Sequence, residues 1–463
     1  MDIPVTALIL AAGLGTRMKS RKAKVLHRAG GRTLVEHVVD TALALVPPER
    51  IFVVVGHHAE QVVATIESCH VRTVIQAEQK GTAHAVEACR EVAAGQPGLL
   101  VVLYGDCPLL RAETLGKLIT HQRQSSAAAT MLTTRLEDPA GYGRILRGAD
   151  GGVEGIVEHK AAAPDELAIR EINSGIYCFR SELVWKHIGK IRPNNPAKEY
   201  YLTDIVSVLR QAGHQVDAIF HEDARELLGI NTMVELAEAD RLLRERTARR
   251  LMLDGVTILK PETVTIDAQV RIGMDTVIEP FAQILGRTEI GEDCHIGACS
   301  ILHDSKLGDR VLVAPFTMVG SSTLDDDVQA GPFARLRMEN HLETGSRVGN
   351  FVELKKTRLG AGAKSLHLAY LGDSVIGKKT NVGAGTITCN YDGIHKHPTK
   401  IGDGAFVGSN ATLVAPVEIG DGSYVGAGSV VTENVPADAL ALGRGRQVNK
   451  PGWAKKRRES RKR

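Results

Sequence analysis

The hydrophobic pattern of the first half of the chain predicts a layered α/β domain. Short apolar runs, among them VTALIL, RIFVVVG and LLVVLYGD, alternate with amphipathic segments such as VEHVVDTALALV and AEQVVATIESC. Continuous β-branched runs are typical of parallel strands that are covered on both faces. We therefore expect a doubly wound α/β sheet over residues 1–232, with ligands at the carboxyl ends of its strands.

The pattern changes twice after this domain. Residues 233–254 are rich in helix formers and charge and contain no Pro or Gly, which predicts a long linker helix. From residue 255 onward an aliphatic residue recurs every six positions, which indicates a hexapeptide β-helix rather than an α-helix or an alternating strand. The series is Ile266, Ile272, Ile278, Ile284, Ile290, Ile296 and Leu302, and it returns as Ile401, Val407, Leu413, Ile419, Val425 and Val431.

Two segments interrupt this repeat. PFARLRMENHLETGS after Gly331 and NYDGIHKHPT between Asn390 and Thr399 are both expected to break the six-residue register. Insertions in such a coil form loops on one face, commonly the binding face. Because a solenoid presents flat sides to its neighbours, we also expect an oligomer.

Composition and charge narrow the class of protein. The 463 residues are too many for one ordinary core, and seven cysteines without a CxxC pair favour a reducing cytoplasm over a disulfide framework or structural zinc. No signal peptide or membrane span is expected. Residues 455–463 hold seven Lys or Arg, so the rest of the chain carries 50 basic and 53 acidic residues. We therefore expect no nucleic-acid or membrane partner, and a solvated, disordered tail.

Candidate chemistry begins at the turn after the first apolar run. Gly13 and Gly15 let backbone N–H groups approach a phosphate, while Arg17 and Lys24 supply positive charge for a triphosphate. Asp106 follows the apolar strand LLVVLYGD, where a carboxylate can hold Mg²⁺ or, with equal weight, cap a helix or form a turn before Pro108.

A second polar motif, QAEQKGTAHAV, lies between these two elements. Gln76 and the Gly81-Thr82 pair can read the edge of a base through side-chain amide and backbone groups. The same residues also describe an ordinary turn that opens a helix.

The coil carries polar clusters where a structural repeat would be plain. The segments are FVELKK, HLAYLGD and NVGAGTITCNYDG. His367 is the natural general base, because an unperturbed pKa near 6.5 lets it take a proton from an amine at neutral pH. The groups suited to a sugar phosphate, its hydroxyls and an oxyanion are Arg337, Lys355, Lys396, Tyr370, Asn381 and Asn390.

Taken in order, these motifs resemble a known family. LAAGLGTRM with the Lys24-Val25-Leu26 run, QAEQKGTAHAV, YGDCPLL, GYGRI, GIVEHK, EINSGIY and LLGIN are similar to the sugar-1-phosphate nucleotidyltransferases. They most resemble the bacterial bifunctional N-acetylglucosamine-1-phosphate uridyltransferase/glucosamine-1-phosphate acetyltransferases. The resemblance implies a Rossmann-like nucleotidyltransferase domain followed, over residues 255–463, by a left-handed parallel β-helix that forms homotrimers. Ala23 departs from the pattern, since the family has a Pro there that would pre-set the Lys24 loop.

For the first domain the resemblance implies uridylyl transfer from UTP to N-acetylglucosamine-1-phosphate with release of pyrophosphate. Arg17 and Lys24 would act on the phosphates, and Asp106 with Asn231 would ligate Mg²⁺. The implied substrate-binding residues are Leu10, Ala11, Ala12, Gly13, Gln76, Gly81, Thr82, Tyr104, Gly105, Asp106, Gly141, Glu158, Asn173 and Asn231.

For the coil the resemblance implies acetyl transfer from acetyl-CoA to glucosamine-1-phosphate, at a site shared between subunits. His367 would deprotonate the amine and Glu353 would orient His367. The sugar phosphate would be bound by Arg337, Lys355, Tyr370, Asn381 and Lys396. The acetyl-CoA groove would be lined by Ala384, Asn390, Tyr391, Ser409, Ala427 and Arg444.

Two alternatives compete with this bifunctional synthesis of UDP-N-acetylglucosamine. In one, the first domain is the only enzyme and the coil regulates or assembles it. In the other, the chain is a non-catalytic scaffold, like the subunits of translation-factor exchange complexes that share this domain pairing. A scaffold predicts degraded phosphate and metal positions, whereas here those positions are all present.

Overall fold

The computed structural model describes residues 3–149 and 151–461, and the chain forms two compact units. The division lies between Arg244 and Glu245, inside helix α9 (Met233–Leu253), rather than at either end of that helix. None of the helices in the described ranges has both the length and the apolar character that a bilayer crossing needs.

The first unit is built on a mixed sheet with strand order β11-β7-β10-β6-β1-β4-β5. Strands β6, β1, β4 and β5 are parallel, whereas β10 runs antiparallel to both β6 and β7 and departs from the all-parallel expectation. The strands are β1 (Val5–Leu10), β4 (Ile51–Val55), β5 (Arg72–Ile75), β6 (Leu99–Tyr104), β7 (Ala129–Arg135), β8 (Arg144–Arg147), β9 (Val153–Val157), β10 (Glu171–Arg180) and β11 (Val216–Phe220).

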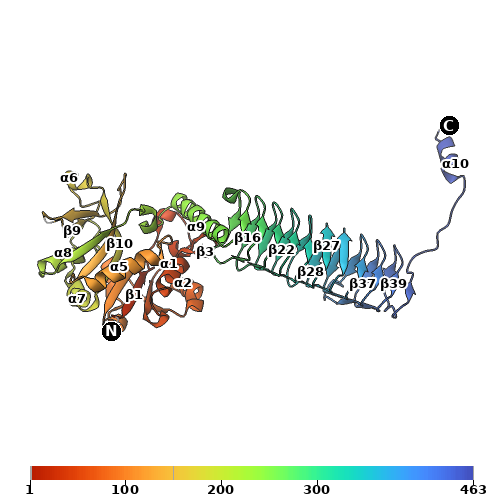
Figure 1. Cartoon of the computed structure of the whole chain (residues 1–463), viewed down its shortest axis with the longest axis horizontal. Coiled ribbons are helices and arrows are strands. Elements are labelled where there is room, and N and C mark those ends of the chain that lie inside the picture. Colours follow the sequence, from red (N-terminus) through yellow and green to blue (C-terminus); the bar gives the residue numbers. More distant parts are fainter. Residues whose placement is uncertain (1–2, 150, 462–463) are drawn as a thin grey trace. The chain divides into compact units, whose positions relative to one another are not determined.

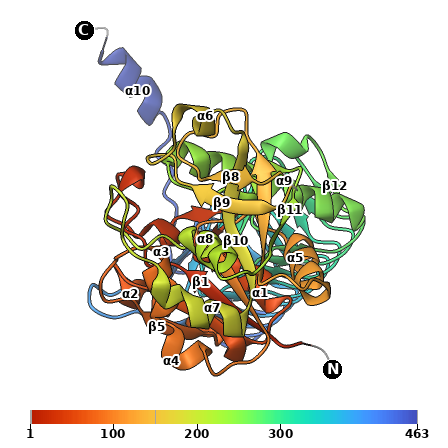
Figure 2. The same ribbon diagram turned by 90° about the vertical axis from the view of Figure 1, so that its left-hand side faces the viewer.

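Alternate residues of the central strands face two separate cores. Leu8 of β1 packs in one core with helices α3, α7 and α8, and its neighbour Ile9 packs in the other with α1, α2 and α5. This covering of both faces, visible around the sheet in Figure 2, confirms the doubly wound α/β prediction. The helices are α1 (Leu34–Leu43), α2 (Ala59–Ile66), α3 (Thr82–Glu87), α4 (Arg90–Ala93), α5 (Ala112–Gln124), α6 (Pro164–Leu167), α7 (Ser181–His187) and α8 (Asp204–Gln211).

The second unit is a coil of three parallel sheets with 11, 10 and 9 strands. Almost every strand pairs with the strand three further along the chain, as β15 (Val277–Ile278) does with β18 (His295–Ile296), so three short strands make one turn. The six-residue series points inward, and its members are buried. Figure 1 shows the turns stacked from β16 (Gln283–Leu285) to β39 (Tyr424–Val425). The hexapeptide β-helix is confirmed, and the coil fits the left-handed form that the resemblance implies.

The expected register break after Gly331 is wrong. Ala330, Leu336, Leu342 and Val348 keep the six-residue spacing and are all buried. The pattern is obscured elsewhere, because one corner in several turns is a residue shorter. Leu302 is followed by its next inward residue, Leu307, after five positions.

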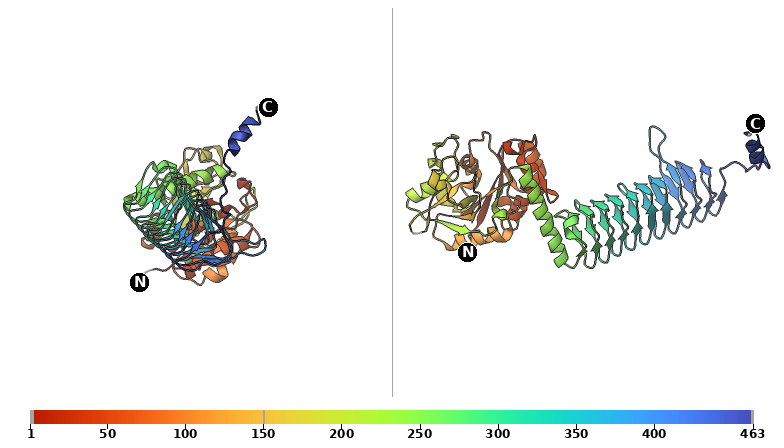
Figure 3. Two further views of the ribbon diagram at one scale, coloured as in Figure 1. Left: turned by 90° about the vertical axis from the view of Figure 1, so that its right-hand side faces the viewer. Right: turned by 90° about the horizontal axis from the view of Figure 1, so that it is seen from above.

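The second interruption is a true insertion. Residues 390–398 leave the coil between β34 (Ile387–Cys389) and β35 (Thr399–Ile401), and the loop projects from the stacked turns in the right-hand view of Figure 3. At the chain end, Trp453–Glu459 form an exposed helix, α10, where a disordered tail was expected. Ala, Lys, Arg and Glu in this segment are helix formers, which accounts for the difference. Residues 462 and 463 of the basic tail lie outside the described residues.

Candidate active sites

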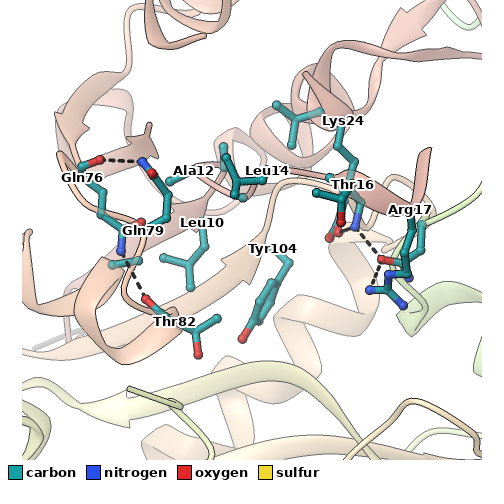
Figure 4. A pocket seen from close by; sticks show the side chains of 18 of the residues that line it. Leu10, Ala12, Leu14, Thr16, Arg17, Lys24, Gln76, Gln79, Thr82 and Tyr104 are labelled. Atoms are coloured by element: carbon teal, nitrogen blue, oxygen red, sulfur yellow. Dashed lines mark hydrogen bonds and ion pairs between the residues drawn. The ribbon is translucent and has the colours of Figure 1, made fainter. Parts of the chain in front are cut away.

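A cavity of about 480 Å³ opens at the carboxyl ends of β1 and β6. Figure 4 shows Gln76, Gln79 and Thr82 at one end of it, Arg17 and Lys24 at the other, and Tyr104 pointing between them. The cavity is lined by Leu10, Ala11, Ala12, Gly13, Leu14, Gly15, Thr16, Arg17, Lys24, Val25, Gln76, Gln79, Gly81, Thr82, Ala85, Tyr104, Asp106, Glu199 and Asn231.

Two cations and two oxygen ligands converge at the Lys24 end. The Lys24 Nζ donates a hydrogen bond of 2.7 Å to Asn231 Oδ1, and Arg17 Nη2 donates one of the same length to the same oxygen. Lys24 also forms an ion pair with the Asp106 carboxylate. Asp106 does not cap the following helix, because α5 begins after Arg111, but it does lie in the turn that follows β6.

The backbone around Lys24 allows this convergence. Gly15 has a left-handed φ of 62°, and a Cβ there would lie 2.6 Å from Lys24 Cβ, so a glycine is required. Ala23 has φ −56° and ψ 137°, which lies within the range that a proline ring imposes. The chain therefore holds Lys24 in a proline-compatible conformation without the family's Pro.

Backbone hydrogen bonds fix the two predicted metal ligands to each other. The Ile230 N–H donates to the carbonyl of Asp106 at 2.9 Å, and Asn231 Nδ2 donates to the carbonyl of Gly229 at 2.9 Å. The Glu235 carboxylate accepts from the backbone N–H groups of Asn231 and Thr232, at 2.5 and 2.9 Å. The first turn of α9 thus anchors Asn231.

Amide side chains occupy the opposite end of the cavity. Gln76 is buried, its Nε2 donates to the carbonyl of Gly81 at 3.2 Å, and Gln79 Nε2 donates to the carbonyl of Gln76 at 3.0 Å. Gln79, Thr16 and Glu199 line the cavity without having been singled out from the sequence. Nothing in their local sequence distinguishes them from other polar residues.

Three predicted sugar-binding residues, Gly141, Glu158 and Asn173, are not among the lining residues of this cavity. The Asn173 Oδ1 accepts from the Gly175 N–H at 3.1 Å, and a Cβ on Gly175 would lie 2.6 Å from the Tyr104 ring. Burial raises the pKa of Tyr104, and the Glu158 and Asp106 carboxylates add to this effect. Glu158 and Asn173 therefore lie behind the Tyr104 side of the cavity.

Glu158 gives a prediction about stability. Burial raises the pKa of Glu158; the Thr203 hydroxyl, which donates to it at 3.0 Å, opposes this shift, and the charge of Asp204 adds to it. Because the pKa of Glu158 is higher in the folded chain than its value of 4.5 in the unfolded chain, ionisation of Glu158 lowers the stability of the fold as the pH rises above 4.5. Glu158→Gln should therefore gain stability relative to the native chain between about pH 4 and about pH 7. Calorimetry across this range measures the difference, Glu154→Gln at an exposed position is the control, and a pH-independent difference would contradict the prediction.

In the coil, His367 pairs with an asparagine that the sequence analysis did not identify. Strands β27 (Arg347–Asn350) and β30 (Lys364–His367) place Asn350 opposite His367, and His367 Nδ1 lies 2.8 Å from Asn350 Oδ1. An oxygen acceptor at Nδ1 requires a proton there, which leaves the Nε2 lone pair for base chemistry. Glu353 instead accepts from Arg337 Nη1 at 3.1 Å, so the described contacts of these residues do not include the expected Glu353–His367 pair.

Other predicted sugar-phosphate residues gather beside the inserted loop. The loop carries Lys396, and the ammonium of Lys355 lowers the pKa of Lys396. A Cβ on Gly372 would lie 2.5 Å from Tyr370 Oη and 2.7 Å from Asn390 Nδ2. The side chains of Tyr370 and Asn390 can therefore lie against the backbone of Gly372 only because this residue has no side chain.

Asn381 lies on a different sheet from Lys355 and Tyr370. Its strand, β33 (Asn381–Val382), pairs with β30, which ends at His367. Lys355 and Tyr370 belong to β28 (Glu353–Lys355) and β31 (Tyr370–Gly372), which pair with each other in the neighbouring sheet. The structure therefore places Asn381 with the His367 strand rather than with the lysines.

The predicted acetyl-CoA residues form a column along one corner of the coil. The Gly383 N–H donates to the Val407 carbonyl and the Gly408 N–H to the Val425 carbonyl, so the residues that follow these glycines lie on successive turns. Arg444 Nη1 donates to the carbonyl of Ala427 at 3.0 Å. The column comprises Ala384, Ser409, Ala427 and Arg444, whereas Asn390 and Tyr391 lie on the inserted loop.

Comparisons with known proteins match both units. Residues 7–252 match the family of MobA-like NTP transferase domains, and residues 269–304 and 398–433 match the bacterial transferase hexapeptide repeat. The chain is 59% identical over 459 residues to the Bifunctional protein GlmU of Solibacter usitatus (strain Ellin6076), covering 99% of this chain and 98% of that protein. It is 48% identical over 457 residues to the Bifunctional protein GlmU of Koribacter versatilis (strain Ellin345), with 98% and 97% covered.

The chain belongs to the GlmU family. A third relative, the Bifunctional protein GlmU of Geobacillus sp. (strain WCH70), is 46% identical over 447 residues, with 96% of this chain covered. Because the GlmU match spans both units, the chain is a bifunctional enzyme of UDP-N-acetylglucosamine synthesis, with uridyltransferase and acetyltransferase activities. Neither a single-enzyme chain with a regulatory coil nor a scaffold is supported.

Proposed function

We propose that the two reactions are carried out separately by the two domains, residues 1–232 for uridylyl transfer and residues 255–463 for acetyl transfer, joined by a linker helix over 233–254. The observation that carries this proposal is that each domain brings its own predicted site residues together. Arg17 and Lys24 both donate to Asn231 in the first domain, and His367 pairs with Asn350 in the second. Acetylation comes first, because its product is the acceptor in uridylyl transfer.

Mg²⁺ fits the Lys24 end of the first cavity. Asp106 and Asn231 both present an oxygen to one ammonium, so their oxygens already converge on a cation. Among the described residues there is no group of three or more His, Cys, Asp and Glu that could hold a metal. Two protein oxygens with substrate phosphates are the usual environment of Mg²⁺, which supplies charge neutralisation for the triphosphate when bound.

The protein's own groups align the uridylyl transfer. Arg17, Lys24 and the N–H groups of the Gly13–Gly15 turn bind the phosphates, while Gln76 and the Gly81-Thr82 pair hold the uracil. A phosphate oxygen of N-acetylglucosamine-1-phosphate attacks the α-phosphorus of UTP, a new P–O bond forms, and pyrophosphate leaves. No protein nucleophile is needed, so alignment and charge stabilisation provide the catalysis.

In the coil, His367 activates the acceptor. Asn350 holds the proton on Nδ1, and Nε2 takes a proton from the amine of glucosamine-1-phosphate, whose nitrogen then attacks the thioester carbonyl of acetyl-CoA. The C–S bond breaks, the imidazolium of His367 returns its proton to the sulfur, and CoA leaves as its thiol. Arg337, held by Glu353, acts with Lys355 and Lys396 on the sugar phosphate.

Substrate assays test this assignment. We expect CoA thiol release with glucosamine-1-phosphate and acetyl-CoA, and pyrophosphate release with UTP, N-acetylglucosamine-1-phosphate and Mg²⁺. A folded preparation without thiol release would end the acetyltransferase assignment, and one without pyrophosphate release would end the uridyltransferase assignment. The seven free cysteines support a cytoplasmic location.

An exposed apolar rib supports the homotrimer. Phe316, Phe333 and Phe351 occupy the same corner of successive turns, are 51%, 48% and 56% exposed, and stack with ring centroids 5.1 and 5.5 Å apart. Leu368, 61% exposed and adjacent to His367, continues this corner by donating its N–H to the Asn350 carbonyl. A second copy that covers the rib would border His367, as a shared acetyl-transfer site requires.

Phe333→Glu should therefore dissociate the oligomer and reduce acetyl transfer more than about tenfold, because the charge would be buried against a neighbouring subunit. Light scattering measures the assembly, and pyrophosphate release should stay unchanged. Val375→Glu is the matched control, since Val375 is 49% exposed on the sheet that also presents Arg358 and Lys400. A trimeric Phe333→Glu protein would contradict the assignment of this interface.

A further inference from the structure

Asp373 lies at the junction of the coil and the inserted loop. It follows β31, at the corner before β32 (Ser374–Ile376), with a left-handed φ of 49°. Its N–H donates to the carbonyl of Lys355 at 2.9 Å, which ties it to the preceding turn. No functional role was assigned to this residue from the sequence.

Asp373 attaches both ends of the loop. Its carboxylate accepts a hydrogen bond from Asn390 Nδ2 where the loop begins, and its carbonyl accepts from the Thr399 N–H, at 3.2 Å, where the loop ends. The loop carries Tyr391 and Lys396, which are paired in a β-bridge. The position of Lys396 relative to Lys355 therefore depends on these two attachments.

A different aspartate maintains the internal shape of the loop. The Asp392 carboxylate accepts from the N–H groups of Ile394 and His395, at 2.7 and 2.6 Å, and from His397 Nε2 at 2.8 Å. These bonds lower the pKa of Asp392 to about 2. The loop is thus folded by Asp392 and attached to the coil by Asp373, so the two functions can be tested separately.

The Asp373 carboxylate also affects the paired lysines. The ammonium of Lys355 lowers the pKa of Lys396, and the Asp373 carboxylate acts in the opposite direction. In the described part of the chain, Asp373 forms no ion pair within 4.0 Å of either lysine. The carboxylate therefore offsets part of the repulsion between the two ammonium groups through space.

We propose that Asp373 is a positioning residue of the acetyl-transfer site, which holds the 390–399 loop in place and keeps Lys355 and Lys396 together for the sugar phosphate. This inference rests on the proposed acetyltransferase function of the coil. It extends that function to a residue that touches neither reacting group.

Two substitutions separate the two effects. Asp373→Asn keeps an oxygen acceptor for Asn390 but removes the charge, whereas Asp373→Ala removes both. We expect tryptic cleavage after Lys396 to accelerate at least about tenfold in Asp373→Ala and to stay near the native rate in Asp373→Asn. KM for acetyl-CoA and for glucosamine-1-phosphate should rise at least about tenfold in Asp373→Ala.

Asp373→Asn should show its effect in the pH profile. Without the carboxylate the pKa of Lys396 falls further, so Lys396 loses its proton at a lower pH, and the alkaline rise in KM for glucosamine-1-phosphate should begin at a lower pH than in the native enzyme. Pyrophosphate release is expected to stay unchanged in both variants.

Asp403→Ala is the structural control, because Asp403 also accepts a backbone N–H at a coil corner, that of Lys378 at 2.7 Å, but does not contact the loop. Native rates of cleavage after Lys396 together with native KM values in Asp373→Ala would overturn the proposal, as would equal effects of Asp403→Ala. The proteolysis readout does not need catalysis, so a native enzyme without acetyl transfer would refute the proposed function and still leave the loop attachment measurable.

Discussion

Replacing His367 by Ala should lower acetyl transfer about 10²- to 10⁴-fold and leave uridylyl transfer unchanged. The Nε2 lone pair that Asn350 leaves available at His367 would be gone, and no other imidazole in the described contacts of Asn350 can replace it. Thiol release from acetyl-CoA measures the loss, with pyrophosphate release from the same preparation as the reference.

Two variants sharpen this result. His303→Ala removes a coil histidine that pairs with Asp304 and should have little effect on acetyl transfer. Asn350→Ala keeps His367 but no longer fixes which ring nitrogen carries the proton. We therefore expect a smaller loss of acetyl transfer than in His367→Ala. Native thiol release in His367→Ala would remove His367 from the mechanism.

Replacing Asp106 by Asn should lower pyrophosphate release about 10²- to 10³-fold, because the side chain that faces Lys24 loses its negative charge at the Lys24 end of the cavity. With UTP present, we also expect the protein to bind Mn²⁺ more weakly, a readout that does not depend on turnover. Thiol release should remain native, and Asp165→Asn in the exposed helix α6 is the control. Unchanged pyrophosphate release at limiting metal would contradict the assignment of Asp106.

Most of the fold could be predicted because the spacing of apolar residues along the chain differs between the two units. Six-residue spacing of buried aliphatic residues specifies the coil, and β-branched runs specify the parallel strands. The prediction failed after Gly331 because turns such as Leu302 to Leu307 use a shorter corner, which shifts the phase without ending the coil. The antiparallel direction of strand β10 was also missed, because a run of buried residues shows the same hydrophobic pattern in a parallel and in an antiparallel strand.

Several of the predicted site residues lie together in the structure, but the contacts between them could not be predicted from the sequence. Asp106 and Asn231 are far apart in the chain, and their meeting at Lys24 depends on the path of the backbone through Ile230. Likewise Glu353 was the expected partner of His367, yet strand register places Asn350 opposite it. Such partners are set by which residues face each other on neighbouring turns, and residue type alone does not reveal this.

The ammonium of Lys24 contacts the same two side-chain oxygens that would hold Mg²⁺, so the pocket carries a positive charge of its own at that position. A bare metal ion would have to expel it from both oxygens at once. A triphosphate offers the same ammonium a new and more highly charged partner. Nucleotide binding would therefore move Lys24 from carboxylate to phosphate, which would leave the Asp106 and Asn231 oxygens available to hold the metal.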